Sequence, residues 1–225
     1  MKKTFLLIFI LSSCITQNAL ASVTFEIQSG NDTLSAFTKN KKIPAVFALP
    51  ITTALSYFPE LKNIQINFVI SKAFTPLSTK PAFTSMFKRK KRRTYIVTIS
   101  DQSIDTLSHL LYKNLNFQEQ VGIMGHELSH VVDFDHQNFF QSTATAIGHL
   151  SKRYIDKMEF NTDLICIKHG LSKYLEVYSM HVRKTMHVSY WRGVDHVFEK
   201  DDHIERYMNP ATIEKYMQST PDLNK

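Results

Sequence analysis

Residues 122–132 read Gly-Ile-Met-Gly-His-Glu-Leu-Ser-His-Val-Val and contain the pattern His-Glu-x-x-His. On a helix, His126 and His130 lie on one face, one turn apart, so both imidazoles can reach the same metal ion. Glu127 follows the first histidine and points to the side of that ion. Zinc lowers the pKa of a bound water to about 7, and a carboxylate can then take its proton. These five residues predict two zinc ligands and a general base.

The alternative is a core helix with two hydrogen-bonded histidines. Leu128 and Val131 suit a buried helix, but burial of Glu127 would then have no purpose. We therefore favour the metal site. With this pattern the sequence resembles the zincin metallopeptidases, for which such a helix is the signature. The resemblance implies a mixed sheet, an active-site helix beneath it and a helical second half.

A third ligand is expected, because a catalytic zinc usually takes three protein ligands. Glu159 and Asp163 are four residues apart in a predicted helix over 151–169, so they share a face. This pattern resembles the gluzincins, especially the HtpX-like class. The resemblance implies that Glu159 binds zinc and that Asp163 orients the first histidine by accepting its other ring N–H.

A rival third ligand is His136. Residues 130–136 match the metzincin extension His-x-x-Gly-x-x-His, except that Asp133 stands in place of the glycine. The chain must turn sharply there, and aspartate adopts a left-handed conformation less readily than glycine. We therefore favour Glu159. A stripe of small residues supports this choice, since it predicts close packing of the two helices; its members are Gly122, Gly125, Cys166 and Gly170.

The chain has 225 residues and is 43% hydrophobic, which fits a single domain over residues 22–225 with a real core. Residues 1–21 are typical of a bacterial signal peptide, with Lys2 and Lys3, an apolar run over 5–11, and Ala19-Leu20-Ala21 before the predicted mature start at Ser22. Leu11-Ser12-Ser13-Cys14 is the alternative, a lipoprotein signal that would anchor the chain through Cys14. Either signal predicts export, to the periplasm or the cell exterior.

Removal of the signal peptide leaves Cys166 alone, so no intrachain disulfide is expected. No later segment is long and apolar enough to cross a membrane. The formal net charge falls from +7 to +5, because the two lysines leave and the segment has no acidic residue.

The predicted elements run from strands to helices, which indicates an α+β fold. The expected strands are 23–27, 63–71, 81–87 and 94–100, with a short helix over 50–61. The expected later helices are 101–115, 116–134, 139–150, 151–169 and 171–186, followed by short helices and loops over 189–225.

The six basic residues 88–93 link two predicted strands. We interpret them as a solvated hairpin tip, with attraction of an acidic substrate or an anionic membrane as the alternative. Nucleic acid is not an expected partner, because no binding motif or aromatic interleaving accompanies the charge. Residues 81–87 or 94–100 are candidate edge strands for an extended substrate.

The expected function is that of an exported zinc metallopeptidase, an endopeptidase acting on protein or peptide substrates with Zn2+ and with Glu127 as base. The alternatives are a non-catalytic zinc-stabilised module that binds a protein, or an envelope hydrolase acting on peptidoglycan peptides. The oxyanion-stabilising residue stays open among Tyr178, His181, Arg183, His187 and Tyr190. Nothing in the sequence predicts an oligomeric state.

Overall fold

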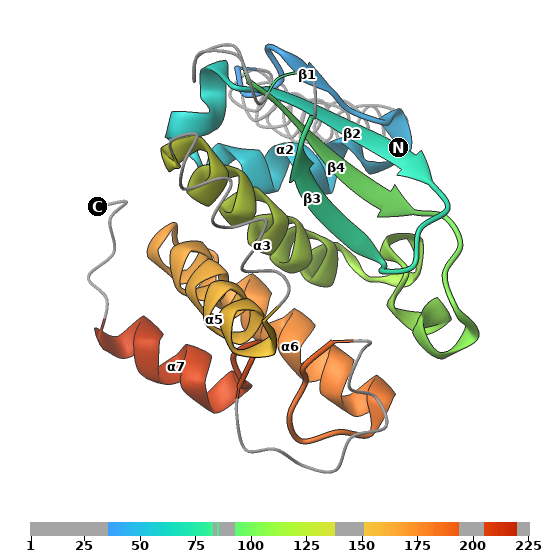
Figure 1. The fold of residues 1–225 in the computed structure, drawn as a ribbon, viewed down its shortest axis with the longest axis vertical. Coiled ribbons are helices and arrows are strands. Elements are labelled where there is room, and N and C mark those ends of the chain that lie inside the picture. Colours follow the sequence, from blue (N-terminus) through green and yellow to red (C-terminus); the bar gives the residue numbers. More distant parts are fainter. Residues whose placement is uncertain (1–35, 83–84, 86–92, 138–150, 194–204, 220–225) are drawn as a thin grey trace, which may run out of the picture. The chain divides into compact units, whose positions relative to one another are not determined.

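The computed structural model describes residues 36–82, 85, 93–137, 151–193 and 205–219 (Figure 1). The chain divides into two compact units, residues 1–37 and 38–225, and every element below belongs to the second. The expected signal peptide, the strand over 23–27 and the helix over 139–150 lie outside the described residues. Among the described helices, none combines the length and the apolar character needed to cross a membrane.

The sheet has four described strands in the order β1-β2-β4-β3. They are β1 (Lys41–Lys42), β2 (Gln65–Ser71), β3 (Leu77–Pro81) and β4 (Thr94–Ser100). The first two pairings are parallel, and β3 runs antiparallel to β4. Buried and more exposed residues alternate along β4, so one face of the sheet meets the core, as expected from the sequence. The predicted mixed α+β architecture is confirmed at this level.

Two expected elements differ from the structure. The strand expected at 81–87 lies earlier, at Leu77–Pro81, and most of 83–92 lies outside the described residues. The helix expected at 101–115 is wrong, because this segment forms two 3-10 helices, η5 (Asp105–Leu110) and η6 (Tyr112–Asn114). The segment connects β4 to α3, and its side chains Leu107, Leu110 and Tyr112 are all buried.

The helix expected over 50–61 divides at Pro59. Residues Ala48–Ser56 form α2, preceded by η1 (Ala45–Phe47), and Pro59–Asn63 form the 3-10 helix η2. Proline lacks the backbone N–H that continues an α-helix, so α2 ends before it. In Figure 1 α2 and α3, the longest of the described helices, lie beneath the sheet.

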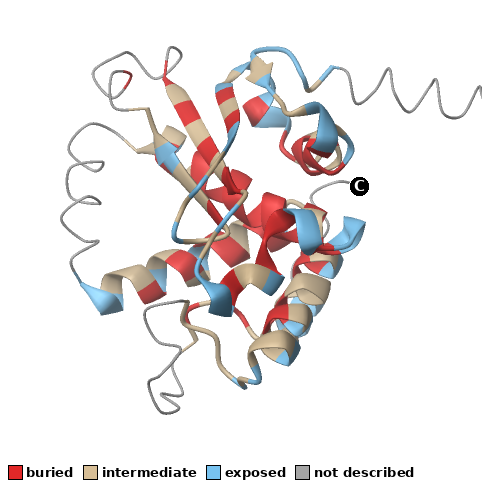
Figure 2. Cartoon of the chain, turned by 90° about the vertical axis from the view of Figure 1, so that its right-hand side faces the viewer, coloured by how far each residue is buried: buried red, intermediate tan, exposed pale blue. Residues whose placement is uncertain are grey.

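Helix α3 (Phe117–His136) is the predicted motif helix. Asn116 and Glu119 form a capping box at its start: the Asn116 side chain accepts from the Glu119 N–H, and Glu119 Oε2 accepts from the Asn116 N–H. All twelve residues from 121 to 132 are buried, on every side of the helix. The cause is its position between the sheet with α2 on one side and the C-terminal helices on the other (Figures 1 and 2).

The C-terminal helices are α5 (Lys152–Lys168), α6 (Ser172–Met186) and α7 (Pro210–Ser219). The first two match the predicted helices, and Gly170 ends the first of them with a φ of 85°, a conformation that favours glycine. Both pack against α3, and α7 packs on α5 and α6.

The two glycines of α3 allow this close packing, but one of them faces α6 and not α5, the helix expected from the sequence. A Cβ at Gly122 would lie 2.2 Å from the carbonyl oxygen of Tyr174, at the start of α6 rather than on α5. A Cβ at Gly125 would lie 2.6 Å from Leu171 Cδ1 and 3.0 Å from Cys166 Sγ. The pair Gly125–Cys166 therefore serves the predicted α3–α5 contact, and Gly122 serves the α3–α6 contact.

Arg93 is the last of the six basic residues 88–93 and the one member of that run that the structure describes, and it is buried. Its Nη1 donates to the carbonyl oxygens of Phe134 and Gln137, at 3.3 and 2.9 Å, at the C-terminus of α3. A cation at this end complements the helix dipole. The interpretation of the whole run as solvated is therefore wrong for this residue, and 88–92 lie outside the described residues.

An ion pair between His169 and Glu60 joins the two halves of the unit. His169 Nε2 lies 2.7 Å from Glu60 Oε1, and the His169 ring stacks on Phe58 with centroids 4.4 Å apart. Burial alone would lower the pKa of His169, but its hydrogen bond to Glu60 raises the net value above the ordinary one. Burial alone would raise the pKa of Glu60, but the same bond lowers the net value.

These two shifts fix the sign of the pH effect. The raised histidine pKa stabilises the fold below about pH 6.5, and that contribution is lost as pH rises through the folded pKa of His169. The lowered carboxyl pKa stabilises above about pH 4.3, and that contribution is lost as pH falls through the folded pKa of Glu60. The pair therefore contributes most between these two values.

Candidate metal centre

Three side chains from two helices converge at the centre of the unit. His126 and His130 come from successive turns of α3, and Glu159 comes from α5. Glu159 Oε2 lies 3.1 Å from His126 Nε2 and 3.2 Å from His130 Nε2. All three residues are buried, and together they form a group that could hold a metal ion.

These separations suit a tetrahedral ion. Ligand atoms at about 2.0–2.2 Å from zinc lie about 3.4 Å from one another in that geometry. The observed 3.1 and 3.2 Å need only a small adjustment to reach this value. The donor set of two imidazoles and one carboxylate is also one that zinc takes at catalytic sites. The residues present therefore fit a zinc ion, although other divalent ions accept similar donors.

Hydrogen bonds direct both imidazoles toward that position. His126 Nδ1 lies 2.7 Å from Asp163 Oδ1, and a carboxylate can only accept, so Nδ1 carries a hydrogen and Nε2 is the ring nitrogen that a metal ion can bind. Thr162 Oγ1 donates to the Met158 carbonyl and lies 3.3 Å from His130 Nδ1, from which it can accept. Each histidine thus presents its Nε2 to Glu159 and to the metal position.

Asp163 is itself fixed on its far side. Its Oδ2 accepts from the Met208 N–H at 2.7 Å, so one carboxylate joins α3 to the segment before α7. This segment also holds Arg206, which pairs with Asp156 on α5 at 2.7 Å. The predicted contact between Asp163 and the first histidine is present, and the contact to Met208 was not predicted.

The electrostatics of the group favour a cation. Burial alone would lower the pKa of His126, but Asp163 and Glu159 raise it well above the ordinary value. Burial alone would raise the pKa of Glu159, but the two histidines lower it. With both imidazoles neutral, the two buried carboxylates would give the site a net negative charge. A divalent cation bound between the ligands would compensate this charge.

Glu127 lies beside the group but is not part of it. Its side chain is buried, and its Oε2 accepts a hydrogen bond from Thr79 Oγ1 at 2.7 Å. Thr79 is the central residue of β3, so the sheet fixes one oxygen of this carboxylate.

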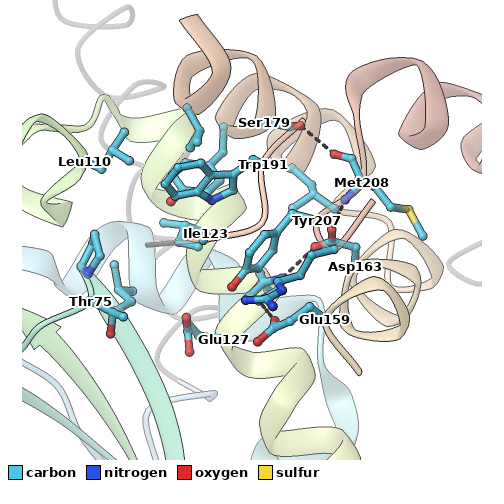
Figure 3. Close-up of a pocket in the computed structure, with 18 of the residues that line it drawn as sticks. Thr75, Leu110, Ile123, Glu127, Glu159, Asp163, Ser179, Trp191, Tyr207 and Met208 are labelled. Carbon is cyan, nitrogen blue, oxygen red and sulfur yellow. Dashed lines mark hydrogen bonds and ion pairs between the residues drawn. The ribbon is translucent and has the colours of Figure 1, made fainter. Parts of the chain in front are cut away.

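A cavity of about 250 Å³ opens over these residues, between β3, α3, α5 and α6. Figure 3 shows Glu127 and Glu159 on one side of it and Leu110, Ile123 and Trp191 on the other. The cavity is therefore polar at the candidate metal position and apolar beyond it.

Of the five oxyanion candidates, Tyr178 and Arg183 line this cavity, and His181, His187 and Tyr190 are not among its lining residues. The Arg183 guanidinium already donates to the carbonyls of Ser179 and Tyr207. Sequence reasoning missed Tyr207, whose ring lies 5.6 Å from that of His126 and whose side chain points into the cavity (Figure 3). Burial raises its pKa well above the ordinary value, so the hydroxyl stays a donor.

The rival ligand His136 is not brought to the site. Helix α3 continues through Asp133 to His136 without the turn that the metzincin pattern needs. The side chain of His136 is exposed at the helix end, and the metal-binding group identified among the described residues does not include it.

Comparison with known proteins adds no assignment. No protein-family model matches the chain, and neither a curated protein nor a solved structure matches it.

Proposed function

We propose that the protein is a zinc-dependent metallopeptidase of gluzincin type, with His126, His130 and Glu159 as ligands. The observation that carries the proposal is the approach of Glu159 to both histidine Nε2 atoms, with Asp163 on the far side of His126. Bound zinc would supply a water of lowered pKa and an electrophile for the substrate carbonyl.

In this proposal Glu127 takes a proton from the attacking water and passes it to the leaving amine. Thr79 keeps the carboxylate oriented through the reaction. Tyr207 donates a hydrogen bond from its hydroxyl to the oxyanion that develops on the scissile carbonyl. Asp163 holds the His126 ring so that its Nε2 stays directed at the metal.

Among the strands that the structure describes, β3 has no partner on the side away from β4, and this edge provides a place for the substrate backbone. β3 is the last strand in the sheet order, whereas β4, one of the two expected edges, lies inside the sheet. The Ser100 N–H donates to Pro76, and the Ala82 N–H donates to Thr94. With this alternation, the backbone groups of Leu77 and Thr79 point away from β4.

An extended peptide can therefore pair with Thr79, the residue that also binds Glu127. Its scissile bond would then pass beside the base. A zinc-stabilised binding module explains this arrangement less well, because a structural zinc site usually closes its fourth position with a protein ligand. The group of three leaves that position for water.

The decisive experiment compares the full chain with Glu127→Gln on a mixture of unfolded proteins, with zinc content measured in parallel. We expect the variant to retain zinc and lose hydrolysis, because it keeps every ligand and lacks the base. Glu214→Gln, an exposed change on α7, is the matched control and should remain active. Full activity of Glu127→Gln, or loss of its metal, would overturn the proposal.

Export is a separate part of the proposal and rests on residues 1–21. The mass of the exported form should correspond to a chain that begins at Ser22. A lipid-modified Cys14 would instead place the protein on a membrane surface.

A further inference from the structure

Helix α5 carries three buried carboxylates on one face, Asp156, Glu159 and Asp163. Their spacing of three and four residues places them on successive turns of the helix. Glu159 belongs to the candidate metal centre, and Asp163 accepts hydrogen bonds from His126 and from the Met208 N–H. Asp156 is not one of the described residues that line the cavity, so contact with a substrate does not account for its burial.

Two arginines from separate segments meet at the Asp156 carboxylate. Arg206 Nε lies 2.7 Å from Oδ1, and Arg192 Nη2 lies 2.6 Å from Oδ2. The most exposed of the three side chains, that of Arg192, is only 11% exposed. Burial alone would raise the pKa of Asp156, but the two guanidinium groups lower the net value, so this carboxyl stays charged. Charge-assisted hydrogen bonds at such a buried position hold their partners more firmly than exposed ion pairs do.

Each arginine adjoins a residue of the cavity wall. Trp191 precedes Arg192, and Tyr207 follows Arg206. Both Trp191 and Tyr207 line the cavity (Figure 3). The Tyr207 N–H donates to the Trp191 carbonyl oxygen at 3.4 Å, so the two segments lie next to each other. Asp156 therefore binds both segments from outside the cavity.

Side chains, rather than backbone ladders, set the path of residues 205–209. These residues lie outside the described helices and strands. Arg183 Nη2, on α6, donates to the Tyr207 carbonyl oxygen at 3.0 Å and fixes the backbone on one side of the tyrosine ring. The contact of Arg206 with Asp156 fixes it on the other side.

The position of Tyr207 matters because a hydrogen bond to an oxyanion depends on its geometry. The Tyr207 ring lies 5.6 Å from that of His126, beside the candidate metal centre. A misplacement of about 1 Å, caused by a change far from the reacting atoms, can cost about 100-fold in rate. Loss of an anchor outside the cavity can therefore lower the rate without removing any group that touches the substrate.

We propose that Asp156 is a positioning residue: through Arg192 and Arg206 it keeps Trp191 and Tyr207 at the cavity, and so places the oxyanion donor of the proposed reaction. The inference rests on the proposed function. It adds to that function the buried contacts that hold the tyrosine in place.

The first experiment needs neither hydrolysis nor metal. Trp191 is the only tryptophan in the chain, so its fluorescence reports the surroundings of its segment. Asparagine at position 156 has one acceptor oxygen, so it can accept from only one of the two arginines. We expect the emission of folded Asp156→Asn to shift to longer wavelength and its quenching by acrylamide to increase. Asp105→Asn, an exposed change on η5, removes the same charge and should leave both unchanged.

The second experiment separates positioning from stability, with kinetics on a peptide that the wild type cleaves. Asp156→Asn should lower kcat by about 10–100-fold with KM and zinc content retained. In a Tyr207→Phe background the same change should cost no more than roughly twofold, because the hydroxyl that it positions is already absent.

Arg206→Lys keeps the test open if Asp156→Asn does not fold. It retains a positive charge beside Asp156 but lacks the guanidinium geometry. We expect a smaller loss of kcat that likewise disappears in the Tyr207→Phe background.

Unchanged tryptophan emission and unchanged kcat in folded Asp156→Asn overturn the inference and leave the proposed function standing. Equal losses of kcat with and without the Tyr207 hydroxyl also overturn it, because Asp156 would then act through another group. If the wild type hydrolyses no peptide, the proposed function fails and the inference fails with it, whatever the emission of Asp156→Asn.

Discussion

Replacing Asp163 with asparagine tests the carboxylate that connects His126 on α3 to Met208 in the segment before α7. Both carboxylate oxygens accept hydrogen bonds, Oδ1 from His126 Nδ1 and Oδ2 from the Met208 N–H. Asparagine has one acceptor oxygen and one donor amide at nearly the same volume. Whichever way the amide turns, its NH2 group faces another N–H donor.

The magnitude follows from that mismatch. One buried donor loses its acceptor, at a cost of about 1–3 kcal/mol. At 1.4 kcal/mol per factor of ten, the loss corresponds to zinc binding that is weaker by about 5- to 150-fold. Removal of a group that orients a metal ligand usually weakens metal affinity or activity by about 10–100-fold, which falls within this range.

The assay is competition for zinc against a chromophoric chelator at fixed pH, with folding followed by circular dichroism. Asp135→Asn is the matched control, because Asp135 lies on α3, accepts from the Tyr95 hydroxyl at 3.1 Å and can still do so as an amide. Its zinc affinity should equal that of wild type. Wild-type affinity in folded Asp163→Asn would refute the proposed role of this carboxylate.

The other predictions concern separate contacts. Thr79→Val should lower kcat by about 10–100-fold with KM and zinc content retained, because a hydrogen bond to a charged group contributes about 1.5–3 kcal/mol. Thr79→Ser should restore activity. A change in KM with kcat unchanged would contradict this role. Gly122→Ala should lower the free energy of unfolding by about 1–3 kcal/mol in urea titration, because the new methyl group meets a backbone oxygen of α6. Arg93→Gln should lower stability by a similar amount, about 1–3 kcal/mol, because it weakens the contacts to the end of α3, and an unchanged Tm would show that they contribute nothing. Glu60→Gln should lower Tm near pH 5.5, where the ion pair is worth up to about 1 kcal/mol at this partly exposed position. The difference in Tm from wild type should shrink as pH rises through the folded pKa of His169. A difference that stays constant with pH would show that titration of His169 does not cause it.

Much of the centre could be predicted because its elements are local. His126 and His130 are one helical turn apart, and so are Glu159 and Asp163, so a helix alone brings each pair to one face. The capping asparagine and the terminating Gly170 are likewise local features, and both helices were predicted within two residues of their observed ends.

The segments that were predicted wrongly are those whose conformation depends on distant partners. Residues 101–115 have an apolar spacing compatible with a helix, but they form two 3-10 helices that pack against α6 and accept a hydrogen bond from Gln120 of α3. The strand after β2 was expected too late in the chain, because its register is set by pairing with β4 rather than by its own alternation.

By itself the sequence determined which side chains can act together within a helix, since those positions follow from 3.6 residues per turn. Only the tertiary structure decided that α5 faces α3 with Glu159 between two imidazoles, and that His136 stays outside. It also decided the contact between Thr79 and Glu127, 48 positions apart, and the approach of Tyr207 and Trp191 to the cavity. The physical reason is that such contacts depend on how buried surfaces dock across the whole core, and no local spacing encodes that docking.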